Sequence, residues 1–190
     1  DPVTLAVLEN RFRAIVEEMG EAMLRTTYSQ ILNSSRDFSI ALCDAEARLV
    51  AQADHIPVHV GAMPFAVEAV REAFPHPADG DIYLLNDPYH GGSHLPDLTI
   101  VVPVFADGAV AFWSVVRAHH TDIGGATHGG YNPAATEIWQ EGVRIPPILL
   151  GEERQPREDL VRMIIANTRL PRDVRGDLMA MIGAAHLGER

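Results

Sequence analysis

The sequence predicts an α+β fold with a long N-terminal helix, a mainly antiparallel sheet built from hairpins, and C-terminal helices. Three observations carry this prediction. Apolar residues near the N-terminus recur at three- and four-residue steps, the period of an amphipathic helix. Short β-prone runs then follow one another with tight turns between them, which is typical of antiparallel strands. Helical spacing dominates again near the C-terminus.

Elements expected in the first half of the chain begin with one amphipathic helix. Residues 3–27 carry Leu, Phe, Ile, Val and Met at helical steps, with Glu and Arg between them. Residues 38–43 and 49–52 flank a polar turn and predict a hairpin. Residues 63–74 regain helical spacing and stop at a proline. The apolar run at 82–85 predicts another strand.

The second half is expected to add the longest strands and the closing helices. Residues 98–105 and 109–119 are rich in Val and Phe and are joined by Ala-Asp-Gly, so they predict a second hairpin. Residues 121–135 are rich in Gly, Asn and Pro and predict a loop. Two helices are expected near 157–168 and 172–187.

Composition and charge limit the classes of function. The 190 residues are 47% hydrophobic, which is enough to build the core of a single globular region over residues 1–190. The net charge of −11, from 26 acidic and 15 basic residues, disfavours nucleic acid and anionic membranes as partners. No apolar run is long enough to span a bilayer, and no signal-peptide pattern is present. Because Cys43 is the one cysteine, a cytoplasmic protein without internal disulfides is expected.

Imidazoles, carboxylates and glycines gather in two segments beside expected strands. The first reads Asn-Asp-Pro-Tyr-His-Gly-Gly-Ser-His-Leu-Pro-Asp over 86–97, and the second reads His-His-Thr-Asp-Ile-Gly-Gly over 119–125. Divalent metals prefer such ligands, and glycine lets the backbone approach an ion closely. Most of the nine histidines lie in Gly- or Pro-bearing segments of this kind: His55, His59, His90, His94, His119, His120 and His128. A metal site is therefore expected here.

The register of the second hairpin decides whether Asp97 and His119 share one ion. A three-residue loop at 106–108 would place Asp97 opposite Arg117, with His119 as a diagonal neighbour on the same face. A two-residue Asp-Gly turn would shift the pairing by one residue and move His119 off that face. The local sequence leaves both registers open. In the first, a loop carrying His94 would complete a three-ligand site.

Segments along the whole chain carry a resemblance to a known family. They are Asp1–Leu5, Arg36–Ser39, Leu49–Gly61, Asn86–Tyr89, Gly92–Asp97, Ala118–Gly125 and Glu137–Pro147. In this order and without large gaps, they resemble the N-terminal part of the B subunits of the hydantoinase/oxoprolinase family. That family includes N-methylhydantoinase, ATP-dependent 5-oxoprolinase and, more distantly, the acetone and acetophenone carboxylases. The resemblance implies that the chain is the N-terminal portion of a longer subunit.

A division of labour between two subunits follows from the resemblance. The A subunit binds ATP and phosphorylates the substrate, which is a hydantoin, 5-oxoproline or another cyclic amide. The B subunit then hydrolyses the activated species at a metal centre. A hetero-oligomer with an A-type partner is therefore expected.

The resemblance also assigns roles to residues. It places the metal ligands on the trio that spacing brings together, His94, Asp97 and His119. Asp37 would be a catalytic carboxylate that bridges a second ion, and His59 a further ligand. Apart from the resemblance, Asp122 is a second candidate catalytic residue, whose carboxylate could fix the tautomer of a ligand histidine. Two imidazoles and a carboxylate suit Zn, Mn, Fe or Co, as one ion or two. Such an ion lowers the pKa of bound water toward about 7 and so supplies a nucleophile.

Three alternatives stay open. An acetone or acetophenone carboxylase subunit would carboxylate a phosphorylated enolate at the same metal. A mononuclear non-haem iron oxygenase also uses two histidines and a carboxylate, although its usual His-x-Asp spacing is replaced here by His-x-x-Asp. In a non-catalytic scaffold, the histidines would only satisfy a polar loop.

Overall fold

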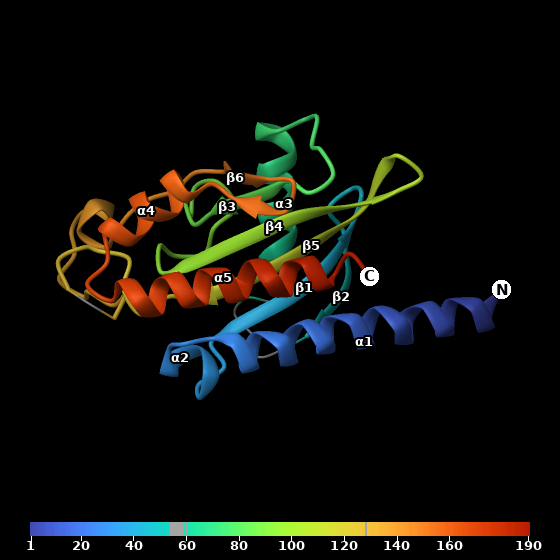
Figure 1. Ribbon diagram of the computed structural model, residues 1–190, viewed down its shortest axis with the longest axis horizontal. Helices are drawn as coiled ribbons and strands as arrows, with labels where there is room; N and C mark the ends of the chain where they lie inside the picture. The colour runs from blue at the N-terminus through green and yellow to red at the C-terminus, as the bar shows by residue number, and fades with distance from the viewer. Residues whose placement is uncertain (54–58, 60, 128) are drawn as a thin grey trace.

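A seven-stranded antiparallel sheet forms the centre of the structure (Figure 1), a computed structural model that describes residues 1–53, 59, 61–127 and 129–190. Its strands lie in the order β2-β1-β5-β4-β3-β6-β7. They are β1 (Phe38–Asp44), β2 (Leu49–Ala53), β3 (Ile82–Leu85), β4 (Asp97–Ala106), β5 (Ala109–His119), β6 (Ile148–Glu152) and β7 (Gln155–Pro156). The two longest strands, β4 and β5, are therefore neighbours near the middle of the sheet.

Helices cover both faces of this sheet (Figure 1). They are α1 (Pro2–Thr26), α2 (Gln30–Asn33), α3 (Met63–Ala73), α4 (Glu158–Ala166), α5 (Pro171–Leu187) and a short 3-10 helix, η2 (Ile138–Gln140). Along β4 and β5 the side chains alternate between faces: Ile100 and Val116 join a core with α1, α4 and α5, whereas Val101 and Val115 join a core with α3. The first turns of α1, α3 and α5 each hold a proline, where its missing N–H costs nothing.

A β-bulge sets the register of the β4–β5 hairpin. Asp107 and Gly108 form a two-residue turn with positive φ at both positions, so Ala106 pairs with Ala109. Between Val104 and Phe105 the pairing then shifts by one residue, because β5 carries one extra residue there. As a result, Asp97 lies directly opposite His119.

The sequence predicted the fold class correctly. The helices at both ends, the two hairpins and the antiparallel sheet are confirmed, with element bounds within a few residues of those expected. Neither expected register of the second hairpin was correct. The turn has two residues, but the bulge returns His119 to the face of Asp97, and Arg117 pairs with Thr99 instead of Asp97. The expected elements did not include α2, η2, β6 and β7, which are short and lie in segments without a clear apolar period.

The N-terminal half of α1 extends beyond the sheet (Figure 1). Val3, Leu5, Val7 and Leu8 are exposed there, whereas one face of the second half of α1 is buried, at Val16, Met19, Gly20 and Met23. In the described part of the chain, no helix combines the length and apolar character needed to cross a membrane.

Candidate metal centre

The end of the β4–β5 hairpin brings Asp97 and His119 together. Because the two residues form a cross-strand pair, their side chains stand on the same face. Asp97 Oδ1 lies 3.2 Å from His119 Nδ1. The backbone N–H of His119 donates to the carbonyl of Asp37 at 3.0 Å, so the end of β5 is fixed from both neighbouring strands.

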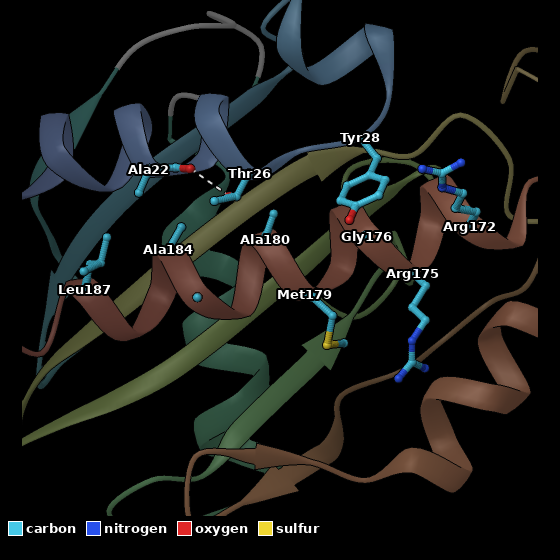
Figure 2. A pocket seen from close by; sticks show the side chains of 11 residues that line it. Ala22, Thr26, Tyr28, Arg172, Arg175, Gly176, Met179, Ala180, Ala184 and Leu187 are labelled. Atoms are coloured by element: carbon cyan, nitrogen blue, oxygen red, sulfur yellow. Dashed lines mark hydrogen bonds between the residues drawn. The ribbon is translucent and has the colours of Figure 1, made fainter.

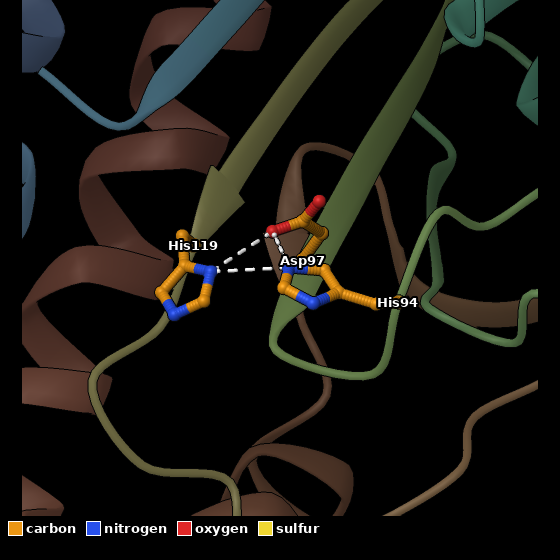
Figure 3. A group of neighbouring side chains, drawn as sticks. All are labelled: His94, Asp97 and His119. Atoms are coloured by element: carbon orange, nitrogen blue, oxygen red, sulfur yellow. Dashed lines mark hydrogen bonds and ion pairs between the residues drawn. The ribbon is translucent and has the colours of Figure 1, made fainter. Parts of the chain in front are cut away.

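His94 reaches the same point from the loop between β3 and β4. Asn86 holds this loop in place, because its side-chain amide donates to the carbonyl of Leu95 at 2.6 Å and its Oδ1 accepts from the backbone N–H of Ile145 at 2.6 Å. Gly92 passes so close to the carbonyl of Asn86 that a side chain there would overlap it. The loop thereby places His94 Nε2 at 2.7 Å from Asp97 Oδ1 and 3.1 Å from His119 Nδ1 (Figure 3).

These three ligand atoms fit one metal ion. Two nitrogens and an oxygen bound to a single tetrahedral ion at about 2.0–2.2 Å would be about 3.3 Å apart. Here the three separations are 2.7, 3.1 and 3.2 Å, and the three side chains converge on one point (Figure 3). In the part of the chain that the structure describes, this is the one His/Cys/Asp/Glu group with such geometry.

Asp97 is the electrostatic centre of the group. Its carboxylate is 2% exposed, and burial alone would raise its pKa. Hydrogen bonds with His119, His59 and His94 outweigh burial and hold the pKa of Asp97 well below its usual range. Ser93 Oγ donates to Oδ2 at 2.5 Å as well. The carboxylate therefore stays ionised, which is the state that a metal requires.

The pKa of His119 is shifted in the opposite direction to that of Asp97. Burial lowers the pKa of its imidazole, but the hydrogen bond and charge of Asp97, followed by the charge of Asp37, raise it above the ordinary histidine value. A site that gathers this much negative potential around two imidazoles favours a bound cation.

His59 contacts the carboxylate oxygen of Asp97 that His94 and His119 do not contact. Its Nε2 lies 3.1 Å from Asp97 Oδ2, the oxygen that faces away from His94 and His119, and its Nδ1 lies 3.1 Å from Ser39 Oγ. At 2% exposed, His59 is held between strand β1 and the carboxylate. Its contacts are those of a residue that orients a ligand.

The structure places the two candidate catalytic aspartates differently. Asp37 lies beside His119 and acts on it through its charge, although its carboxylate is outside the three-residue group. Asp122 is directed elsewhere: its carboxylate is 1% exposed and accepts from the Arg169 backbone, the Arg169 guanidinium and Gly124. Because these bonds use both oxygens, the surroundings of Asp122 do not favour a catalytic role.

The remaining histidines divide between surface and core. His90 Nδ1 contacts Asp87 at 2.8 Å beside the site. His120 faces the opposite side of the sheet, where its Nε2 lies 3.2 Å from Met181 Sδ and burial lowers its pKa to about 4. His55 and His128 lie outside the described residues.

Residues that sequence reasoning missed complete the surroundings of the site. Arg117 is fully buried two cross-strand pairs away from Asp97, and it donates to Thr99 at 2.8 Å and to the carbonyl of Gly91 at 2.9 Å. It thus ties the loop that carries His94 to the hairpin. The sequence feature that could have indicated this role is the position of Arg117 near the end of a β-rich run, because a charged residue in such a run requires polar partners.

A cavity of about 350 Å³ opens beside His94. Its walls come from the loop that carries His94 and from the segment around η2: Pro88, Tyr89, Ser93, His94, Ala135, Thr136, Glu137, Ile138 and Glu141. A volume of this order can hold one small ring. A second, larger groove of about 630 Å³ runs between α1 and α5 (Figure 2), but it is mostly apolar and lies apart from the metal group.

The fold and the site together define an α+β protein with a His–Asp–His metal-binding geometry at the end of a hairpin. The chain belongs to the hydantoinase B/oxoprolinase family, whose model matches residues 1–190.

Similar proteins support this membership. The chain is 40% identical over 191 residues to the caprolactamase subunit beta of Pseudomonas jessenii, covering 100% of this chain and 33% of that subunit. It is 39% identical over 189 residues to the 5-oxoprolinase of Dictyostelium discoideum, covering 99% of this chain and 15% of that enzyme. The chain therefore spans a third or less of the length of these relatives.

Solved structures show the same fold. The ATP-dependent caprolactamase from Pseudomonas jessenii matches with a TM-score of 0.93 at 40% identity, covering 100% of this chain and 33% of that one. A nucleotide-free acetone carboxylase matches with a TM-score of 0.93 at 24% identity, covering 100% and 25%. At this lower identity the likeness concerns the fold alone.

Proposed function

We propose that this chain forms the metal-binding part of a B subunit that hydrolyses cyclic amides in an ATP-dependent enzyme. The observation that carries the proposal is the convergence of His94, Asp97 and His119 within 4.8 Å of one another. The relatives named for caprolactam and 5-oxoproline support cyclic amides as the substrate class.

The protein's own residues prepare the site for this reaction. His94, Asp97 and His119 would hold one divalent ion, which when bound lowers the pKa of water and supplies a nucleophile at neutral pH. Asp97 keeps its negative charge because three imidazoles hydrogen-bond to it. His59 and Ser93 fix the second oxygen of Asp97 and so orient the first toward the two ligand histidines. Asp37 adds negative charge beside His119, as a second ion would require.

A partner must complete the reaction. An unactivated amide resists attack by water, so the proposed reaction needs an ATP-dependent step that activates the amide, and the relative named as a beta subunit supports a second subunit for that step. We therefore infer an A-type partner subunit that binds ATP and phosphorylates the amide oxygen. The resulting phosphorylated imidate is a better electrophile than the amide, so the site in this chain needs to supply only the attacking water.

Metal analysis and turnover test the proposal together. The purified protein should contain or take up close to one equivalent of Zn, Mn, Fe or Co, and His94→Ala or His119→Ala should reduce this to less than about a tenth. With a co-expressed A-type partner, ATP should be consumed in step with ring opening of lactams or hydantoins.

Two outcomes would overturn the assignment. If the wild-type protein binds no stoichiometric metal after reconstitution, the assignment of a metal centre is wrong. If ATP is consumed with ketone and bicarbonate but with no cyclic amide, the protein belongs on the carboxylase side of the family.

A further inference from the structure

The cavity beside His94 contains two glutamates that differ in what their carboxylates do. Glu137 caps η2: its side chain accepts from the backbone of Gln140, whose own side chain accepts from Glu137 in return. In the described part of the chain, the Glu141 carboxylate has no hydrogen-bond or ion-pair partner, although the residue is half-buried. An acid group without a partner in the wall of a cavity is available to a bound molecule.

The backbone holds Glu141 firmly. Its N–H donates to the carbonyl of Ile138 at 3.0 Å, which closes η2. On the other side, Gly125 passes so close that a side chain there would lie 2.7 Å from the backbone carbon of Glu141. Glu141 is therefore presented to the cavity by two packed segments, opposite the loop that carries His94.

We propose that Glu141 is a catalytic residue that carries protons between the attacking water and the ring nitrogen. This inference rests on the proposed function, because it takes as substrate a cyclic amide with a phosphorylated oxygen. Glu141 fits the role because its carboxylate has no partner among the described residues and because the residue lines the same cavity as His94.

Water adds through its oxygen to the ring carbon, and Glu141 carries the two water protons, one at a time, to the ring nitrogen. The bond between carbon and nitrogen breaks, and the nitrogen leaves as an amine. The carbon keeps the water oxygen as a carbonyl and the phosphoryl oxygen as an acyl phosphate, which a second water hydrolyses to carboxylate and inorganic phosphate.

The test compares Glu141→Gln with Glu137→Gln in the protein co-expressed with its A-type partner. Both changes remove one negative charge from the same cavity, but only the first removes a free proton carrier. We expect Glu141→Gln to lower kcat for lactam hydrolysis by about 10²–10³-fold, with KM and metal content unchanged, while phosphorylated substrate accumulates. Glu137→Gln should lose no more than about tenfold, since glutamine still accepts the capping hydrogen bond.

Further variants separate folding effects from chemistry. Glu141→Asp keeps a carboxylate and should recover part of the lost kcat, and Glu21→Gln, on the exposed surface of α1, should match wild type. Equal losses in Glu141→Gln and Glu137→Gln, or a fully active Glu141→Gln, would overturn the role of Glu141 while leaving the proposed function in place. A wild-type protein without ATP-dependent ring opening would instead overturn the proposed function.

Discussion

Single residues in this protein show how burial and hydrogen bonding compete to set the charge of a side chain. Burial raises the pKa of both Asp97 and Cys43, yet only Asp97 has hydrogen-bond partners that favour its charged form. Asp97 therefore remains an anion at the centre of the metal group, whereas Cys43, 0% exposed among apolar neighbours, remains a neutral thiol.

His59 tests whether a residue behind the site acts as a ligand or orients one. Because its Nε2 contacts the far oxygen of Asp97, His59→Ala should weaken metal binding by about 10–100-fold without abolishing it. Competition with a chelating dye measures the Kd. If His59→Ala removes stoichiometric metal as completely as His94→Ala does, then His59 is itself a ligand.

Cys43 gives a prediction about pH. Burial, followed by the charge of Asp44, raises its pKa from 9.0 to about 12, so the thiol is favoured in the folded state and the stability it contributes is lost as pH rises from about 9 to about 12. At pH 9 the folded protein should react with iodoacetamide at least about 100-fold more slowly than the protein in urea. Mass spectrometry follows the labelling. Equal rates would show that Cys43 is accessible and ionised.

At the scale of elements, turns and bulges decide which side chains meet. Two glycines illustrate different constraints. Gly108 has a positive φ and open space around it, so a side chain there would contact no other atom and would cost only backbone strain. Gly92 has an ordinary φ, but its neighbour is the carbonyl of Asn86 in the loop that carries His94.

This difference predicts different results for the two alanine variants. Gly108→Ala should lower the free energy of unfolding by about 1 kcal/mol and leave metal binding unchanged. Gly92→Ala must move the loop, so it should also displace His94 and reduce metal affinity by tenfold or more. Urea unfolding and metal titration measure the two effects. A Gly92→Ala protein with wild-type affinity would show that the loop does not position His94.

Helices and strands also show how much of the fold and of the site could be predicted from the sequence. Periodicity and turn residues were sufficient for α1, α3, α5 and both hairpins, because these signals are local. They did not give the extra residue in β5, since a bulge depends on how a strand twists against its neighbours. The sequence nevertheless grouped His94, Asp97 and His119, because the register expected from a three-residue loop differs from the observed one by two residues, and a shift of two keeps His119 on the face of Asp97. Arg117 and Glu141 were missed because their roles depend on contacts across the fold.

For the whole molecule, two buried carboxylates tie distant segments together. Asp177 on α5 accepts from the backbone N–H groups of Tyr28 at 2.7 Å and Ser29 at 3.1 Å, which holds the end of α1. Asp122 accepts from Arg169 and so joins the loop after β5 to the connection between α4 and α5. These ties link the hairpin that carries Asp97 and His119 to the helices at both ends of the chain.

Asp122 provides the prediction that separates a structural tie from a catalytic group. Asp122→Asn leaves Arg169 without its charged partner and should lower the free energy of unfolding by about 1–2 kcal/mol, because Arg169 is half exposed, while metal content at low temperature stays at the wild-type value. In a double-mutant cycle with Arg169→Ala, the two changes should couple by about 1–3 kcal/mol, because they remove one interaction. Urea unfolding of the four proteins gives these values. If Asp122→Asn instead keeps wild-type stability and loses turnover, then Asp122 acts in the reaction, and the bonds to Arg169 must open when substrate binds.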